Sequence, residues 1–393
     1  MPHFISKNMF IHDKSQQNDF IIMESLVNTR FPDISLIPIM YQDKIFFIRC
    51  IKRKDDFLYK VDKLTRPSDL LLIKKVLQFM ADKLEVVTHN LAQTQTKHTR
   101  GMQSGFLIDS KALAELKPDY IEIGFGSGRH ILDLAKSNPQ KIILGFEIHT
   151  PSIRQVMNAI SIHGLQNLFI CNFDARLGIQ TLHTKSVETI FLHFPIPWNK
   201  AKHRRVFHRD FLENSFRILK ENGHINMRSD DEEYIQDSIK EAMSADYTHF
   251  EILKNKDTHI VSKYEERWHN MQKDIYEMRI FKHDFKQQNN DNNEAIFTLP
   301  QNLKNLQPFC NQKWVQDSIF INIGDLYCTK SSHNISIAQL AFGSFYMPFN
   351  TYLVIDDYEG LHYLKNPLNI NSHIKAHTFL CKILQGTCLE HKK

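Results

Sequence analysis

Residues 118–282 alternate between strand-like and helix-like stretches, and this alternation limits the possible folds more than any other feature of the chain. Alternating strands and helices form a parallel sheet with helices on both faces. Two later strands are close enough in sequence to pair antiparallel at one edge. We therefore predict a three-layer α/β domain with a seven-stranded, mostly parallel sheet. Apolar runs predict strands at 120–124, 142–147, 168–172, 189–194, 224–229, about 249–253 and about 275–281, and helical spacing predicts helices at 129–136, 151–163, 210–220 and 231–243.

The stretches on either side of this domain are predicted to be α+β extensions. Polar linkers at 88–104 and 286–294 separate them from the centre. This gives three parts: an N-terminal extension with its linker at 1–104, the central domain at 105–285, and a C-terminal extension at 286–393. Neither extension carries a recognisable chemical motif. Their expected elements are strands at 34–40 and 44–50, a helix from Pro67-Ser68-Asp69 to about Lys83, strands at 318–323 and 351–356, and a closing helix.

Composition narrows the class of protein. The sequence contains no apolar run of about 18 residues, which a membrane span would need. It also lacks the basic and then apolar segment that is typical of a secretion signal. The six cysteines form no CxxC pair and mostly lie in apolar stretches, which is typical of reduced thiols. The net charge is only +5, so local cationic clusters matter more than the sum. We expect a cytoplasmic protein without membrane contact.

A glycine-rich turn follows the first strand of the central domain. Gly124, Gly126 and Gly128 stand in an ExGxGxG pattern and let the backbone turn tightly and approach a ligand. A dinucleotide fingerprint would need a glycine at 129, where the chain has arginine. Glu122 precedes the first glycine by two residues and would favour a cationic ligand over a pyrophosphate. S-adenosylmethionine, with its amino and sulfonium groups, fits this pattern.

Two further carboxylates follow the second and third strands. Glu147 lies where a carboxylate can accept hydrogen bonds from both hydroxyls of a ribose, and Asp174 could accept one from an adenine amino group. Each feature has a structural alternative. The glycines could form a simple tight turn, Glu147 could be a surface charge, and Asp174 could cap a turn. The ends of three successive parallel strands meet at one edge, so their combination favours a cofactor site.

The stretch FPIPWNKAKHRR, residues 194–205, follows the fourth strand. Pro195 has no backbone N–H to give a sheet ladder, so it ends the strand. The cluster of cations after Trp198 predicts a binding site for an anion. The alternative is a solvated helix start. The side chains concerned are Lys200, Lys202, His203, Arg204 and Arg205.

Taken together, these residues resemble the bacterial tRNA (guanine-N7-)-methyltransferases. The resemblance covers about residues 118–282 and is most specific in the FPxPW-K-HxRR stretch and the late SKYEERW box. It implies the class I S-adenosylmethionine-dependent methyltransferase fold, a tRNA substrate, and methylation of guanine 46 in the variable loop without a metal. The extensions would be additions of one branch of the family. The matching stretches are EIGFGSGRHILDLAKSNP (122–139), GFEI (145–148), NFDA (172–175), FLHFPIPWNKAKHRR (191–205), RILKENGHINMRSD (217–230) and SKYEERW (262–268).

The chain departs from the family pattern at two places near the expected substrate. Ile196 stands where the family usually has an aspartate that is often taken as catalytic, and His193 replaces a more usual asparagine. Guanine N7 has an in-plane lone pair, so in-line attack on a methyl group needs alignment rather than a general base. Asp230, after the fifth strand, could hold the guanine and balance its developing positive charge. We therefore expect an active enzyme in which Asp230 compensates for Ile196.

The resemblance also implies substrate contacts from Lys200, Asp230, Ser262, Tyr264 and Glu265, and Arg267 could add another. It further implies that the anion at the cationic cluster of 200–205 is RNA phosphate, whose contacts position a nucleic acid without reading its sequence. Two rival functions remain: a methyltransferase for another substrate, such as a different RNA base, or a tRNA-binding protein that lost catalysis with Ile196. An active tRNA methyltransferase explains the intact glycine turn and the basic loop together better than either rival function does. His203 and His208 lie among cations that would repel a metal ion, so we expect no metal site, and we expect His130 to be structural. Whether the protein is a monomer or a homodimer does not follow from the sequence.

Overall fold

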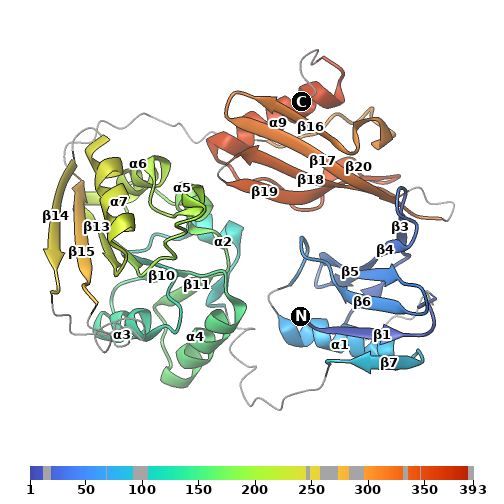
Figure 1. Cartoon of the computed structure of the whole chain (residues 1–393), viewed down its shortest axis with the longest axis horizontal. Coiled ribbons are helices and arrows are strands. Elements are labelled where there is room, and N and C mark those ends of the chain that lie inside the picture. The colour runs from blue at the N-terminus through green and yellow to red at the C-terminus, as the bar shows by residue number, and fades with distance from the viewer. Residues whose placement is uncertain are drawn as a thin grey trace. The chain divides into compact units, whose positions relative to one another are not determined.

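The computed structural model describes residues 1–11, 19–67, 69–91, 105–244, 248–256, 273–282, 296–330, 335–345 and 347–387. The chain forms two compact units (Figure 1). The central unit spans Thr96–Asp291. Met1–Gln95 and Asn292–Lys393 together form the flanking unit, so the two expected extensions pack together into one body. No helix in the described ranges is long and apolar enough to cross a membrane.

An eight-stranded sheet runs through the central unit in the order β14-β15-β13-β12-β9-β10-β11-β8. Every neighbouring pair is parallel except the two that involve β15, which runs antiparallel to β13 and β14. The seven expected strands are all present, and the antiparallel edge is confirmed; β8 adds a short eighth. Their bounds are β8 Leu107–Ile108, β9 Tyr120–Ile123, β10 Ile143–Phe146, β11 Leu168–Cys171, β12 Val187–His193, β13 Leu219–Ser229, β14 Thr248–Lys254 and β15 Tyr276–Lys282.

Helices cover this sheet on both sides, as Figure 1 shows. The four expected helices are present, and two short ones were missed. The helix α5 has only seven residues, too few for a 3.6-residue apolar period to be recognised. The central core combines apolar residues of β9, β10, β12 and β13 with those of the covering helices. The helices are α2 Ser110–Glu115, α3 Arg129–Ser137, α4 Thr150–His163, α5 Ala175–Thr181, α6 Arg209–Ile218 and α7 Glu232–Ser244.

The flanking unit is built on one antiparallel sheet with strands from both ends of the chain. Its main order is β20-β19-β18-β17-β3-β4-β5-β6-β1-β7, with β16 beside β17 and β2 beside β4. The two halves join where β17 pairs with β3, at Tyr327–Asn28 and Cys328–Val27. The bounds are β1 His3–Ser6, β2 Ile21–Ile22, β3 Leu26–Asn28, β4 Ile34–Tyr41, β5 Lys44–Lys52, β6 Phe57–Val61, β7 Val86–His89, β16 Gln312–Gln316, β17 Ile319–Cys328, β18 Ser336–Ser344, β19 Pro348–Asp356 and β20 Gly360–Tyr363.

Local chemistry explains the elements that were expected in the flanking unit. The hairpin β4–β5 turns at Gln42 and Asp43, which both have positive φ, as a two-residue hairpin turn requires. The helix α1, Leu70–Ala81, begins where the Asp69 carboxylate accepts hydrogen bonds from the N–H groups of Leu71 and Leu72. A second helix, α9 (Asn371–Leu384), packs on β17 and β18. The sequence therefore predicted these local elements, but not that the strands from both ends of the chain share one sheet.

Candidate active site

The candidate site lies at the carboxyl ends of the central parallel strands. From β9 the chain proceeds outward to β10 and β11, then returns to place β12 on the other side of β9. This reversal is a topological switch point, where open α/β sheets form their ligand crevice. The glycine loop follows β9, Glu147 follows β10, Asp174 follows β11, and the 194–205 loop follows β12. The fold therefore brings the expected site segments to one edge.

The glycine loop has backbone angles that favour glycine. Gly124, Gly126 and Gly128 have φ values of 71°, 52° and 80°. A Cβ at Gly128 would lie 2.2 Å from Cγ2 of Val156, so only glycine lets α3 begin this close to α4. A Cβ at Gly124 would meet no atom within 4 Å, and one at Gly126 would meet only the Gly124 carbonyl oxygen at 4.0 Å. The loop is therefore a cradle open to a ligand, as a cofactor site requires.

The carboxylate of Glu147 holds the glycine loop against the next loop. Its Oε2 accepts a hydrogen bond from the Gly126 N–H at 3.0 Å. Its Oε1 accepts from the N–H groups of Ile148 and His149 at 2.8 and 2.9 Å. These bonds fix the carboxylate at the mouth of the crevice. The side chain of Ile148 next to it is 73% exposed, an apolar surface that the sequence analysis missed.

Asp174 has the structural role that the sequence offered as its alternative. It caps α5 by accepting a hydrogen bond from the Arg176 N–H at 3.0 Å. Its carboxylate also pairs with the guanidinium of Arg176, with Nη2 2.7 Å from Oδ2. The Asp174 side chain remains 37% exposed, so part of the carboxylate still faces solvent.

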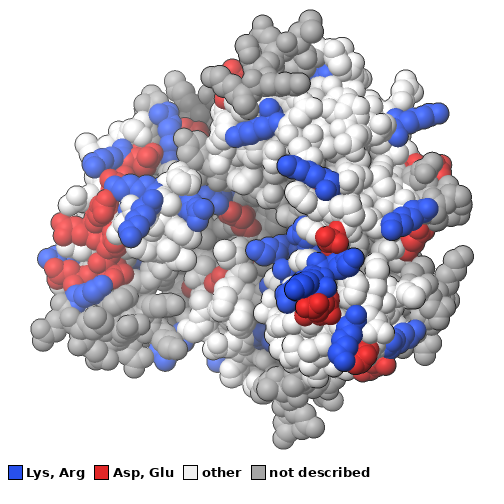
Figure 2. Space-filling view, turned by 45° about the vertical axis from the view of Figure 1, so that its right-hand side comes forward, with Lys and Arg blue, Asp and Glu red and all other residues white. Residues whose placement is uncertain are grey.

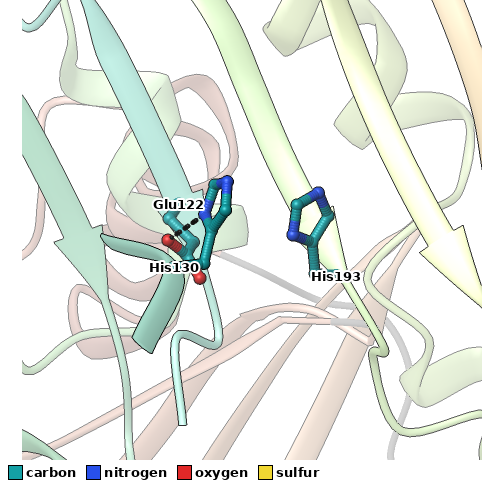
Figure 3. Close-up of side chains that lie close together, drawn as sticks. All are labelled: Glu122, His130 and His193. Atoms are coloured by element: carbon teal, nitrogen blue, oxygen red, sulfur yellow. Dashed lines mark hydrogen bonds and ion pairs between the residues drawn. The ribbon is translucent and has the colours of Figure 1, made fainter. Parts of the chain in front are cut away.

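Glu122 lies beneath the glycine loop and is bonded to a histidine. Its carboxylate Oε2 is 2.8 Å from Nδ1 of His130 on α3, and the Glu122 side chain is only 4% exposed (Figure 3). Burial alone would lower the pKa of His130, but the charge and hydrogen bond of Glu122 outweigh it, and the pKa is raised. This bond agrees with the expectation that His130 is structural, because it fixes the position of the Glu122 carboxylate.

A second histidine faces this pair from the end of β12. The rings of His130 and His193 lie 4.6 Å apart between centroids (Figure 3). Nε2 of His193 is 3.1 Å from Oδ1 of Asn226, within hydrogen-bond distance. Burial, and then the neighbouring His130, lower the pKa of His193 well below its usual value. His193 is therefore neutral at pH 7 and links β12 to β13.

Glu122, His130 and His193 also form a group whose ligand atoms lie within 4.8 Å of one another. The described residues place neither His203 nor His208 in such a group. Glu122 and His130 already bond each other, and the positive charge of Arg228 acts on both imidazoles. A nearby cation disfavours a metal ion, so we interpret the group as a bonded Glu122–His130 pair with the His193 ring packed beside it.

The 194–205 loop is hydrogen-bonded to β13 and to the start of α7. Phe194 and Trp198 have positive φ values of 49° and 45°, which are uncommon for bulky residues and mark a constrained backbone. The Phe194 N–H donates to the Arg228 carbonyl at 2.7 Å, and Nδ2 of Asn199 donates to Oδ2 of Asp231 at 3.1 Å. The loop is therefore preformed beside the end of β13.

Arg205 has a different role from the one expected. It is 3% exposed, and it donates from Nε to the Pro197 carbonyl, from Nη2 to Asn199 and from Nη1 to Asp237, at 2.5, 2.9 and 2.6 Å. Its guanidinium also lies 4.6 Å from the Tyr234 ring centroid. Arg205 thus holds the loop together and is not the exposed cation that phosphate binding needs. The sequence pattern gave no signal for this burial.

The remaining cations of the loop differ in their availability. Lys202 pairs with Glu233 and Asp237 on α7, at 2.6 and 2.8 Å. Arg204 is exposed and lies 5.1 Å from the Trp198 ring centroid. Lys200 and His203 are exposed as well. Three of the five predicted phosphate contacts are therefore displayed, one is engaged in surface ion pairs, and Arg205 is buried.

The departure at Ile196 leaves an apolar side chain in the solvent. Ile196 is 63% exposed, close in sequence to Trp198, which is 37% exposed. Asp230 follows β13, and its carboxylate Oδ2 is 3.0 Å from Nζ of Lys273. Its neighbour Asp231 caps α7 and bonds the loop through Asn199. The fold thus places the expected carboxylate next to the loop that lost its own. Ser262, Tyr264, Glu265 and Arg267 lie outside the described residues.

Comparisons with known proteins relate this chain to methyltransferases. A family model described as a putative methyltransferase matches residues 116–278. The tRNA (guanine-N(7)-)-methyltransferase of Helicobacter pylori strain ATCC 700392 / 26695 is 35% identical over 98% of this chain and 98% of its own length. That of Helicobacter hepaticus is 36% identical over 98% of this chain and 99% of its own. A solved structure of an antibiotic-related methyltransferase is 18% identical, with a TM-score of 0.35, over 47% of this chain and 98% of its own.

The strand order with its antiparallel edge and the glycine loop at the switch point define a class I methyltransferase. The near full-length matches go further, because they include the flanking unit. The chain belongs to the tRNA (guanine-N(7)-)-methyltransferase family.

Proposed function

We propose that this protein methylates N7 of a guanine in tRNA, at position 46 of the variable loop, with S-adenosylmethionine as the methyl donor. One observation carries the proposal: the glycine cradle, the Glu147 carboxylate and the preformed basic loop lie at one switch point. Relatives named tRNA (guanine-N(7)-)-methyltransferase support the substrate class. A tRNA substrate agrees with the cytoplasmic location expected from the cysteines.

The space beside Gly124 and Gly126 is open and could hold a bound cofactor. A side chain at either position would occupy this space. S-adenosylmethionine would supply an electrophilic methyl group on a positively charged sulfur. Glu147 would accept from the ribose hydroxyls, and Asp174 would contact the adenine through its exposed part. Glu122 contributes buried negative charge beneath the loop and orients His130.

The chemistry asks little of the protein beyond alignment. Guanine N7 is nucleophilic without losing a proton, so attack in line with the carbon–sulfur bond needs no general base. Positive charge develops on the purine during transfer, and a carboxylate near the base stabilises it. We assign this role to Asp230, because Ile196 can neither accept a hydrogen bond nor balance charge. Lys273, which pairs with Asp230, would hold the carboxylate in place.

The substrate would bind across the 194–205 loop. Lys200, His203 and Arg204 are exposed and would contact RNA phosphates, with Lys202 able to exchange its surface ion pairs for one. Ser262, Tyr264 and Glu265 remain proposed substrate contacts by resemblance. Arg205 would act indirectly, by keeping the loop in the shape that presents the other cations.

Methyl transfer to unmethylated tRNA tests the proposal directly. Purified protein is incubated with labelled S-adenosylmethionine, and borohydride–aniline cleavage maps N7-methylguanine. Cleavage at the variable-loop guanine is expected. If the label appears on another nucleoside, the proposed substrate is wrong. If the protein binds the cofactor but transfers no methyl group, the result favours a tRNA-binding protein that lost catalysis. The variant Ile196→Asp is a matched control, because it restores the family carboxylate and separates a slow enzyme from an inactive one.

A further inference from the structure

A cavity of about 390 Å³ in the flanking unit lies outside the proposed active site. Its size falls in the usual range for small-ligand sites, about 300–1,000 Å³. Both ends of the chain line it: β5, β6 and the turn after β6 on one side, and β17, β18 and β19 on the other. Its lining includes three cationic and three amide side chains: Arg49, Lys60, Lys63, Asn322, Gln339 and Asn350.

The first side of the cavity concentrates positive charge. Arg49 and Lys60 are direct cross-strand partners on β5 and β6, so their side chains share one face. Like charges directly opposite each other destabilise a sheet. Lys63 adds a third cation on the exposed turn. An anionic ligand would remove the repulsion, so this arrangement favours one.

The protein itself does not neutralise these cations. Across the ranges that the structure describes, none of the three forms an ion pair, and Arg49 donates only to the Tyr327 hydroxyl, at 3.1 Å. Asp62 also lines the cavity but is 3% exposed. Its carboxylate accepts from the Tyr352 hydroxyl and the Leu64 N–H, at 3.1 and 3.0 Å. The cavity therefore keeps a net positive charge.

The second side of the cavity offers amide groups. Asn322 pairs across the sheet with Ala341, and Ala341 pairs with Asn350, which makes a row over three strands. Gln339 lies over Gly324, where a Cβ would come within 3.1 Å of the Gln339 amide oxygen. Side-chain amides both donate and accept, which suits base edges and ribose hydroxyls.

We propose that this cavity binds one nucleotide of the tRNA substrate, with its phosphate on Arg49, Lys60 and Lys63 and its base or ribose on the amide row. The inference rests on the proposed function for its ligand, since the same chemistry would also accept a free nucleotide. Figure 2 shows Lys and Arg side chains on the visible face of the flanking unit, with Asp and Glu side chains among them. The flanking unit thereby becomes a second RNA-binding site of the enzyme.

The test compares two double variants with the same loss of charge. Lys60→Gln/Lys63→Gln removes cations of the cavity, and Lys304→Gln/Lys375→Gln removes two exposed cations of the same unit outside it. Affinity for unmethylated tRNA is measured from 50 to 300 mM salt with the full chain. We expect the cavity variant to bind roughly tenfold more weakly, with a salt slope shallower by about one to two phosphate contacts, and the control variant to match the wild type.

A third variant keeps the charge and fills the space. Ala341→Phe places a ring on the β18 position that lines the cavity. It should weaken tRNA binding to a similar extent while leaving S-adenosylmethionine affinity and thermal stability near those of the wild type. Adenosine monophosphate is added as a competitor of tRNA. This measurement distinguishes a cavity that binds a nucleotide of tRNA from one that binds a free nucleotide.

Equal tRNA affinity of the cavity variant and the charge-matched control would overturn the inference. So would a nucleotide that binds the cavity while the cavity variant keeps full tRNA affinity, which would make it a site for a free nucleotide. Wild-type methyl transfer is scored in parallel. Its failure would refute the proposed function, whereas tRNA binding by itself decides the inference.

Discussion

Both ends of the central sheet carry charged groups, but they use them differently. At the amino end, Asp119 and Glu188 form ion pairs with Lys141 and Lys220, at distances from 2.5 to 3.4 Å. Two anions and two cations neutralise each other completely there. At the carboxyl end, carboxylates and histidines surround an open glycine cradle, and exposed cations border it.

The difference separates a stabilising network from a functional one. The ion pairs among β9, β10, β12 and β13 connect the ends of these strands, and they leave none of their four charged groups unpaired to bind a ligand. At the other end of the same strands, carboxylates such as Asp230, which pairs with Lys273, and Asp174, which pairs with Arg176, keep part of their surface free. Variants at the two ends should therefore separate activity from stability.

The largest effect is expected at Asp230. Asp230→Ala should lower the rate of methyl transfer about 100-fold or more, because removing one transition-state electrostatic partner typically costs that much. Cofactor affinity should stay near the wild-type value. The control is Asp119→Ala at the amino end, which should lower the melting temperature but leave the rate at saturating substrate unchanged. Full turnover by Asp230→Ala would remove it from the mechanism.

The next effect concerns two adjacent arginines of the same loop. Arg205→Met should lower the free energy of unfolding by about 2–3 kcal/mol, since it leaves Pro197 and Asn199 without their buried donor. Arg204→Met should leave stability within about 0.5 kcal/mol and weaken tRNA binding instead. Urea unfolding and tRNA titration measure the two effects. Equal stability of both variants would show that burial of Arg205 does not hold the loop.

A smaller, pH-dependent effect is expected from the two histidines. His193 has a lowered pKa, so it resists protonation when folded and destabilises the fold as pH falls below the unfolded value of about 6.5. His130 has a raised pKa, so its stabilisation is present below about pH 6.5 and is lost as pH rises through its folded pKa.

Two asparagine variants measure these opposite signs. His193→Asn should lose less unfolding free energy than the wild type between pH 7 and 5. His130→Asn should be more damaging at pH 5.5 than at pH 8. Parallel pH profiles for the wild type and both variants would contradict the coupling of Glu122 to His130.

The smallest effect is expected within the closed ion network. Lys220→Met should change the unfolding free energy by less than about 1 kcal/mol, because the lysine is 39% exposed and Lys141 still pairs with both carboxylates. Added salt should shrink even this difference, as it screens partly exposed pairs. A loss of several kcal/mol in chemical denaturation would mean that the network acts as a buried one.

Much of the central unit was predictable because its signals are local. Apolar runs, helical spacing and the three glycines act within a few residues of one another, so all seven expected strands and the cradle follow from them. The helix α5 was not predicted, because seven residues are too few to show the 3.6-residue apolar period of a helix. The group of Glu122, His130 and His193 also escaped prediction, because its members come from β9, α3 and β12.

The sequence by itself determined the parallel sheet, the glycine cradle and the position of the basic loop. Tertiary structure decided which cations are free: Arg204 and Arg205 are neighbours in sequence, but only Arg205 reaches Asp237, 32 residues away, and becomes buried. It also joined the two ends of the chain, where Asn28 bonds Asp325 across 297 residues. Sequence patterns report on near neighbours, whereas burial and pairing depend on residues that only folding brings together.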